Sequence, residues 1–419
     1  MKEIIKKYKK LDEIEHILLR PGMYIGSTKP HDAVEWILTD KYTKTPICYN
    51  PGFLKLFDEI ISNSIDESKR NSSLDTIWVN LNTETGVISV KDNGGIPVIL
   101  HDEGVYIPEL IFSSLRAGSN FNDEEDRIVA GTNGVGASLT NIFSKRFELT
   151  TGDGKKQFNQ IYSNNMSERT APIIKASDKN FTEIAYVPDY ARFGLAGLDD
   201  NHILMIKKRV FDIAACNSKI KIYFNNEKVN FKSFRDYASL FTDTIFYDSN
   251  ENWEICVAPS IGGNQVISFV NSIETKDGGT HVNYIQNQIV ECLREMLLKK
   301  HKVDIKPSDI KNHLMISINC NILNSSFSSQ TKEKLITEPK AFGSQFEITQ
   351  KFAKTIFQSE ILQSILDWVD KKQLAEERAE LRKLNKNLNT AKIQKLIDAQ
   401  SKDRTLCTLA ITEGDSALG

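Results

Sequence analysis

The hydrophobic pattern between residues 53 and 70 predicts an amphipathic helix. Apolar side chains recur there at intervals of three and four residues, the spacing that places them on one face of a helix. They are Phe53, Leu54, Phe57, Ile60, Ile61 and Ile65. At about 100° per residue, Glu59, Asn63 and Asp66 fall on the opposite face, about one turn apart. A polar row of this kind suits either a solvated surface or a binding site, and the helix alone leaves both interpretations open.

Strand-like runs and helical stretches are interleaved along most of the chain. In the first half, the runs are residues 76–81, 87–91, 147–151 and 182–187. Several antiparallel strands with helices on one face predict an α+β fold, a two-layer sandwich. Further strand-like runs are residues 219–224, 254–258, 266–270 and 314–319, and residues 285–300 read as an amphipathic helix. These later elements predict a second αβ unit.

The same patterns divide the chain into five parts. Residues 1–50 form an irregular N-terminal arm, and residues 51–200 and 201–365 form the two αβ domains. Residues 366–404 carry opposite charges three and four positions apart, which favours a solvated connecting helix over a DNA-binding one. Residues 405–419 follow, where TLCTLAITEG reads as a buried strand with Glu413 at its end, a candidate Mg²⁺ ligand.

Composition restricts the classes of protein to consider. A chain of 419 residues suits two or three domains, and a net charge of −2 gives no overall basic field for DNA. The six cysteines are scattered without metal-binding spacing, which is typical of an intracellular protein with reduced thiols. The basic N-terminus lacks an apolar core, so it is not a secretory signal. No run approaches the roughly 18 apolar residues of a membrane span.

Two stretches offer groups that suit a nucleotide. Asp92 stands at a strand end in DNGGIP, where a carboxylate can accept a hydrogen bond from an exocyclic amine. Gly95 follows, and a glycine lets a flat base approach the backbone. Gly131, Gly134 and Gly136 then lead into a predicted helix, whose N-terminal N–H groups can bind phosphate.

A third stretch, SSQTKEKL, supplies Gln330 and Lys332 far along the chain. The lysine is a positive charge suited to a γ-phosphate. A single loop lysine is normally only solvated, so this interpretation depends on the motifs that precede it.

These motifs resemble those of the superfamily of gyrase, heat-shock chaperone, histidine kinase and MutL ATPases, called GHKL. Within it, the chain is most similar to type IIA DNA topoisomerases. The residues in its motifs are more similar to those of eukaryotic and T-even bacteriophage enzymes than to those of bacterial gyrase. The matching stretches run in family order: EHILLRPGMYIGST (15–28), VYIPELIFSSLRAGSNFND (105–123), KDGGTH (276–281), IKPSDIKNHLMISINC (305–320), SSFSSQTKEKL (325–335) and ITEGDSALG (411–419).

The resemblance implies a GHKL ATPase domain at 51–200, a transducer domain at 201–365 and the start of a TOPRIM domain at 405–419. It implies ATP and Mg²⁺ as ligands. Glu59 would orient or activate the attacking water, and Asn63 would hold Mg²⁺. Lys332 would neutralise charge on the γ-phosphate with Gln330 beside it.

The resemblance also implies nucleotide contacts by a larger set of residues. Asp92 would bind the adenine amine. The other residues are Gly95, Ser119, Asn120, Gly131, Asn133, Gly134, Val135, Gly136 and Thr182. Two departures from the family pattern stand out. The loop DNGGIP lacks one residue, usually Arg, and KNF replaces the glycine pattern that normally precedes Thr182.

As partners, the resemblance implies double-stranded DNA, a second copy of the chain bound through the ATPase domains, and the cleavage part of the enzyme. The arm would cross to the second subunit, with Tyr24 and Ile25 as contacts. The expected location is the cytoplasm of a bacterial or phage-infected cell, or the nucleus in a eukaryote. The function that the resemblance implies is an ATP-hydrolysing gate that dimerises on ATP and captures a DNA duplex. One alternative is a chaperone or mismatch-repair clamp, which the stretches KNH, QTKE and EGDSA disfavour. Another is a nucleotide-gated binding module without turnover.

Overall fold

The computed structural model describes residues 10–117, 127–128, 134–390, 397–411 and 413. It divides into two units, Met1–Leu362 and Gln363–Gly419. Within the described residues, no helix is long and apolar enough to cross a membrane.

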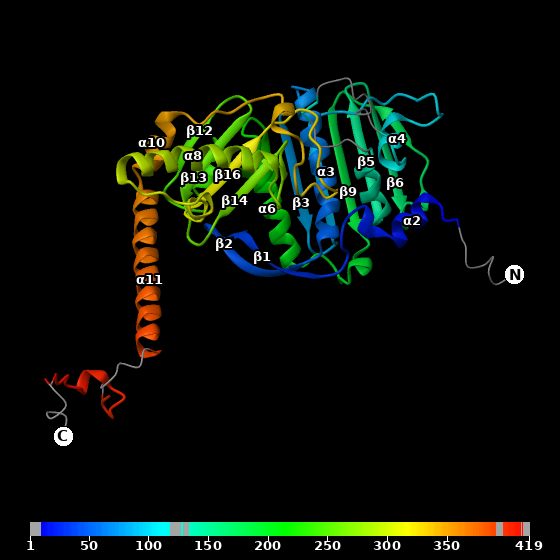
Figure 1. Ribbon diagram of the computed structural model, residues 1–419. Helices are drawn as coiled ribbons and strands as arrows, with labels where there is room; N and C mark the ends of the chain where they lie inside the picture. Colours follow the sequence, from blue (N-terminus) through cyan, green and yellow to red (C-terminus); the bar gives the residue numbers. More distant parts are fainter. Residues whose placement is uncertain (1–9, 118–126, 129–133, 391–396, 412, 414–419) are drawn as a thin grey trace. The chain divides into compact units, whose positions relative to one another are not determined.

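The first sheet has nine strands in the described part of the chain (Figure 1). Their order is β11-β10-β3-β4-β9-β5-β6-β7, with β8 paired to β6, and only the β10–β3 pair is parallel. The strands are β3 Thr76–Asn82, β4 Val87–Asp92, β5 Ser144–Asp153, β6 Lys156–Ser163, β7 Glu168–Arg169, β8 Ile173–Ala176, β9 Asn180–Pro188, β10 Lys221–Phe224 and β11 Glu227–Val229.

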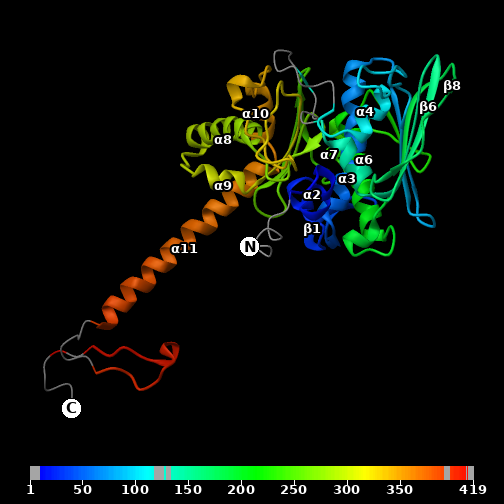
Figure 2. The same cartoon turned by 90° about the vertical axis from the view of Figure 1, so that its right-hand side faces the viewer.

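Helices cover one side of this sheet, which confirms the predicted α+β two-layer arrangement (Figure 2). They are α2 Glu13–Leu19, α3 Pro51–Arg70, α4 Ile107–Ser113, α5 Gly136–Ile142 and α6 Asp200–Cys216, with the short turns η1 Pro21–Met23 and η2 Tyr190–Phe193. The predicted helix at 53–70 is α3, which begins two residues earlier because Pro51 suits a first helical turn. Its apolar face lies in the core shared with the sheet.

The second sheet has the order β12-β13-β16-β14-β15, with β14 and β16 parallel. Its strands are β12 Phe246–Ser249, β13 Trp253–Pro259, β14 Gln265–Val270, β15 Ile273–Glu274 and β16 Leu314–Cys320. The helices that follow or flank these strands are α7 Phe234–Ala238, α8 Thr280–His301, α9 Pro307–Lys311, the turn η3 Pro339–Ala341 and α10 Gln350–Phe357. The predicted strands at 254–258, 266–270 and 314–319 and the predicted helix at 285–300 are confirmed.

Two expectations about domain content are wrong. The strand at 219–224 was predicted to belong to the second αβ domain, residues 201–365. It is instead β10 in the first sheet, where it pairs in parallel with β3. Helix α6 also packs in the first core, so the first layer extends past residue 200 to β11. Local patterning identified the strand, but its partner is set by contacts distant in sequence.

Part of the expected irregular arm is a hairpin. β1 His31–Leu38 pairs antiparallel with β2 Tyr42–Tyr49. Leu38 and Tyr42 pack in the core of the second sheet, where the Tyr42 ring stacks on Phe241 with centroids 4.2 Å apart. Nearer the N-terminus, Ile25 is buried in this chain's first core and Tyr24 packs against that core, so neither lies on a free arm.

The second unit contains most of α11 Glu360–Thr390 and the turn η4 Arg404–Leu406. The expected connecting helix is helical as far as Thr390, the last described residue before 397, and residues 380–384 of it are exposed. The prediction of a buried strand before Glu413 is wrong for residues 407–411. No strand forms there, and Leu409 and Ile411 are exposed. A strand needs a neighbour for its backbone hydrogen bonds, and no described residue supplies one here.

Candidate nucleotide site

A cavity of about 350 Å³ lies between α3 and the first sheet. It is lined by α3, by the ends of β4 and β9, by α4 and the start of α5, and by the loop that carries Lys332. The cavity therefore brings together all three stretches to which the sequence assigned nucleotide chemistry, although they lie far apart along the chain.

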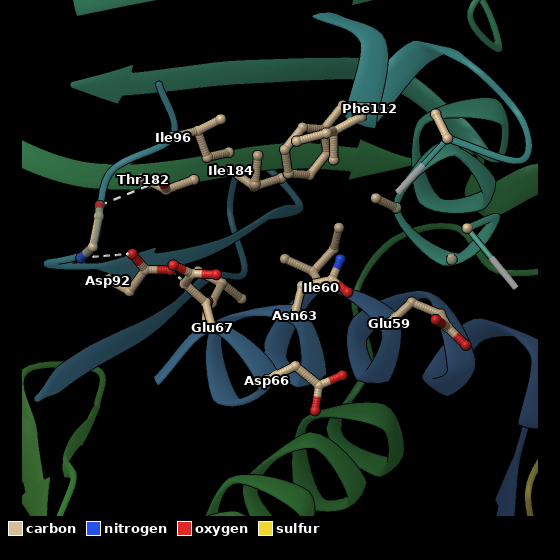
Figure 3. Close-up of a pocket in the computed structure, with 18 of the residues that line it drawn as sticks. Glu59, Ile60, Asn63, Asp66, Glu67, Asp92, Ile96, Phe112, Thr182 and Ile184 are labelled. Carbon is tan, nitrogen blue, oxygen red and sulfur yellow. Dashed lines mark hydrogen bonds between the residues drawn. The ribbon is translucent and has the colours of Figure 1, made fainter. Parts of the chain in front are cut away.

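The polar face of α3 forms one wall of this cavity. Glu59, Asn63 and Asp66 all line it, and Figure 3 shows them projecting from the same helix. Glu59 is only 6% exposed and Asp66 only 3%. The interpretation of this row as a solvated surface is therefore wrong.

Asp92 lies at the other end of the cavity from Glu59, at the end of β4 and beside Glu67 of α3 (Figure 3). The Ser64 hydroxyl donates to Asp92 Oδ2 at 2.6 Å, and the Gly94 N–H donates to Oδ1 at 3.0 Å. Burial raises the pKa of Asp92 to about 6, although these two hydrogen bonds act in the opposite direction. The carboxyl group is held in one orientation and gains its charge only near neutral pH.

Thr182 stands beside Asp92, its partner where β4 pairs with β9, and also lines the cavity. Its hydroxyl lies 3.0 Å from the Thr151 hydroxyl and donates to the Gly94 carbonyl at 3.4 Å. Gly95 also lines the cavity, but its small size has a second cause. A Cβ there would lie 2.1 Å from the Gly152 carbonyl oxygen, so glycine lets this loop pack directly on β5.

The glycine-rich turn enters α5 at the cavity wall. Gly134 has φ +61°, a conformation that favours glycine, and Val135 and Gly136 also line the cavity. A Cβ on Gly136 would lie 1.9 Å from Glu59 Oε2, so this glycine makes room for the carboxylate. Ser119, Asn120, Gly131 and Asn133 lie outside the described residues, and their roles stay predictions.

The end of the cavity near Glu59 is rich in buried charge. Lys55 Nζ lies 2.8 Å from Glu59 Oε1, so these two buried groups form an ion pair. Burial alone would raise the pKa of Glu59, but Lys55 and Lys332 together hold it below its ordinary value. Glu59 is therefore ionised at neutral pH.

Lys332 reaches this end from the loop after β16. It lines the cavity with Gln330 and is 7% exposed. Burial lowers its pKa, and the nearby Glu59 acts in the opposite direction. Its backbone has φ +63°, an uncommon conformation for a side-chain-bearing residue, so the surrounding loop must hold it there.

Sequence analysis missed three charged residues at this end, namely Lys55, Asp58 and Arg209. Arg209 Nε lies 2.5 Å from Asp58 Oδ1, and Lys55 Nζ lies 3.4 Å from Asp58 Oδ2. Lys55 precedes Glu59 by one helical turn, a spacing that could have indicated the pair. No local signal marks Arg209, because α6 approaches α3 only in the folded chain.

The donor set fits the Mg²⁺ that the family resemblance implies. Mg²⁺ prefers oxygen ligands and usually binds through one or two protein groups together with phosphate oxygens and water. The described residues contain no cluster of three or more His, Cys, Asp or Glu that could hold a metal by itself. Asn63 offers a carbonyl oxygen between Glu59 and Asp66, which suits an ion held mainly by a nucleotide. Glu413 is exposed, and its neighbours lie outside the described residues.

An α+β layer with a buried acid, a glycine turn at a helix start and a lysine from a second αβ layer is the arrangement of a nucleotide-binding ATPase. The ATPase region of Saccharomyces cerevisiae topoisomerase II has the same fold, with a TM-score of 0.82, 38% identity and coverage of 87% of this chain and 99% of that one. The chain belongs to the family of type II DNA topoisomerase ATPase regions.

Other comparisons agree. The ATPase and transducer domains of DNA topoisomerase II from Balamuthia mandrillaris match with a TM-score of 0.84 and 36% identity, over 88% of this chain and 98% of that chain. The family model for DNA gyrase B matches residues 212–385. DNA topoisomerase 2 of Arabidopsis thaliana is 38% identical over 437 residues, covering 99% of this chain and 30% of that protein. The chain thus spans about a third of the length of such curated relatives.

Proposed function

We propose that this chain is the ATP-operated gate of a type II DNA topoisomerase. The observation that supports this most is the convergence of Glu59, Asn63 and Lys332 on one cavity, with the lysine supplied by the second αβ layer. ATP bound there would contact both layers. Binding and hydrolysis would then change how the two domains are oriented.

Each described residue has a role in this proposal. Glu59 orients or deprotonates the attacking water, since it is ionised and lines the cavity. Lys332, with Gln330 beside it, stabilises negative charge that develops on the γ-phosphate. Asp92 accepts from the adenine amine, and Thr182 and Gly95 shape the same end. The backbone at Gly134 to Gly136 lies against the phosphates.

Asn63 would hold the Mg²⁺, which neutralises phosphate charge when it is bound. The glycine turn and the segment that carries Ser119 and Asn120 would complete the phosphate and ribose contacts. The ATP-binding domain would end with β11, and the transducer domain would begin after it.

The partners follow from the gate proposal. Two copies of the chain would join through their ATPase domains when ATP binds and would enclose a DNA duplex. DNA cleavage would be performed by another part or subunit that includes a complete TOPRIM domain, with Glu413 as a metal ligand. The protein would act where the DNA is, in the cytoplasm of a bacterial or phage-infected cell or in a eukaryotic nucleus. Neither the site nor the relatives favour a chaperone or a mismatch-repair clamp.

The test is ATP turnover measured against protein concentration, with and without double-stranded DNA. We expect specific activity to rise with concentration, because a competent site is completed when two copies associate. Glu59→Ala, measured in parallel, gives the background from any contaminating ATPase. Flat specific activity over the whole range would contradict the gate, and turnover that equals the Glu59→Ala background would contradict the ATPase itself.

A further inference from the structure

One guanidinium group ties the helix that carries Glu59 to the second sheet. Arg209, on α6, contacts Asp58 with its Nε at 2.5 Å. Its Nη1 donates to the Ser272 carbonyl oxygen at 2.8 Å. Asp58 is the neighbour of Glu59 on α3, and Ser272 lies in the turn between β14 and β15. A planar guanidinium holds two such partners at a fixed distance from each other.

We propose that Arg209 is a positioning residue for ATP hydrolysis, which sets the distance between Glu59 and the loop that carries Lys332. This inference rests on the proposed function, because it assigns a purpose to the spacing of two groups that act on one phosphate.

The segment after Ser272 is hydrogen-bonded to the loop that carries Lys332. Beyond β15, the Asp277 N–H donates to the Glu333 carbonyl at 2.9 Å, and the Leu335 N–H donates to the Gly278 carbonyl at 3.1 Å. Asp277 and Gly278 thus hold the backbone that follows Lys332. A shift of this segment would carry the lysine with it.

Gly279 in the KDGGTH motif makes this attachment close. Its φ is +143°, and a Cβ there would lie 2.4 Å from the Leu335 carbonyl oxygen. Any other residue would push the two segments apart. The motif therefore has a physical role that the sequence did not indicate: Gly279 lets this segment pack closely against the backbone after Lys332.

Helix α6 holds the same segment at a second point. Lys208 Nζ lies 2.8 Å from Glu274 Oε1 and 2.7 Å from Asp212 Oδ2, and its side chain is buried. Burial alone would raise the pKa of Asp58, yet Arg209 and Lys55 hold it well below its ordinary value. The contact of Arg209 with Asp58 is therefore between two ionised groups.

These contacts close a ring. It runs from Glu59 through Asp58, Arg209 and Ser272 to the segment that holds the Lys332 loop, and the lysine returns to the cavity that Glu59 lines. Arg209 is a link in this ring that does not itself line the cavity. Misplacement of a catalytic group by about 1 Å can cost about 100-fold in rate, so a change at this link should affect turnover without direct contact to ATP.

A purely structural ion pair predicts something different. Its loss would lower the melting temperature, while kcat for the folded protein would stay the same. Arg209→Lys separates the two roles, because an ammonium group keeps the charge beside Asp58 but cannot reproduce both contacts of the fork. Gly279→Ala tests the other side of the ring without changing any charge.

The experiment measures kcat, the Kd of a non-hydrolysable ATP analogue and the melting temperature for wild type, Arg209→Lys, Gly279→Ala and Glu59→Ala. Lys221→Ala is the matched control, since it breaks an ion pair with Asp75 that is half exposed and lies outside the cavity lining. We expect Arg209→Lys and Gly279→Ala each to lower kcat about tenfold or more, with Kd within about twofold of wild type and Lys221→Ala unchanged.

An unchanged kcat in both variants, with only a lower melting temperature, would overturn the positioning role. In that case Glu59→Ala would still be inactive and the proposed function would stand. If Glu59→Ala instead turned over ATP like wild type, the proposed function would fail and the positioning role with it.

Discussion

The two ends of the nucleotide cavity are built in different ways. The end around Asp92 is built within the first αβ layer, where Ser64 on α3 and the Gly94 N–H donate hydrogen bonds to the carboxyl group. The end around Glu59 combines charges from α3, from α6 and from the loop of the second αβ layer. One end lies within a single layer, and the other is ionic and assembled across two layers.

This difference separates two tasks. A rigid, desolvated carboxyl group at a strand end can select a base whether or not the second layer is in place. A site that needs Lys332 beside Glu59 is complete only when both layers hold the correct spacing. We therefore expect changes at the Asp92 end to affect nucleotide affinity and changes at the Glu59 end to affect turnover.

The largest expected effect is that of Glu59→Ala. Removal of a general base or water-orienting group typically costs about 10² to 10⁴-fold, so kcat should fall by about 10³-fold. The Kd of a non-hydrolysable ATP analogue should stay within about threefold of wild type, since the carboxylate does not hold the adenine. Equal turnover in the variant and wild type would refute the catalytic role.

Lys332→Ala should have the next largest effect. Loss of one preorganised group that stabilises transition-state charge costs about 10² to 10³-fold in kcat. Single-turnover kinetics of the variant would measure this loss apart from product release. Lys334→Ala, two residues further in the same loop, is the control, because Lys334 does not line the cavity. Similar losses for both lysines would mean that the loop matters only through its fold.

Gly136→Ala should lower turnover about tenfold through the position of Glu59. The added Cβ would lie 1.9 Å from Glu59 Oε2, so the carboxylate must move. Gly197→Ala is the matched control, since a Cβ there meets nothing within 4 Å. Wild-type kcat in Gly136→Ala would show that the position of the carboxylate is not limiting.

The pH dependence of affinity should reveal the Asp92 end. Asp92 has a pKa of about 6 and must lose its proton to act as a full acceptor, so ATP affinity should fall by up to about tenfold per pH unit below pH 6. Asp92→Asn should bind with little change over the same range.

Stability should move in the opposite direction in the nucleotide-free protein. Because burial raises the folded-state pKa of Asp92 above its ordinary value, this group's contribution to the free energy of unfolding is fully present below that ordinary value. It is lost as pH rises through about 6. Melting temperatures of wild type and Asp92→Asn, measured between about pH 4 and about pH 7 so that the range includes the pKa of Asp92, would measure this contribution. A difference between them that does not vary with pH would contradict the raised pKa.

The same contrast explains what the sequence could predict. The periodicity of α3 and the alternation of β3 and β4 are local, so the row from Glu59 to Asp66 and the placement of Asp92 followed from the residues. Lys332 needed the resemblance to a known family, because nothing near it in sequence indicates a phosphate. Arg209 and the pairing of β10 with β3 could not be predicted, since both depend on segments distant in sequence.

The most direct test compares Glu59→Ala with Asp92→Ala in the same two assays, analogue binding and ATP turnover at saturating ATP. We predict that Glu59→Ala keeps its affinity and loses turnover, and that Asp92→Ala binds at least about tenfold more weakly but retains kcat within a few-fold. If both variants lost affinity and turnover in the same proportion, the division of tasks between the two ends would be wrong.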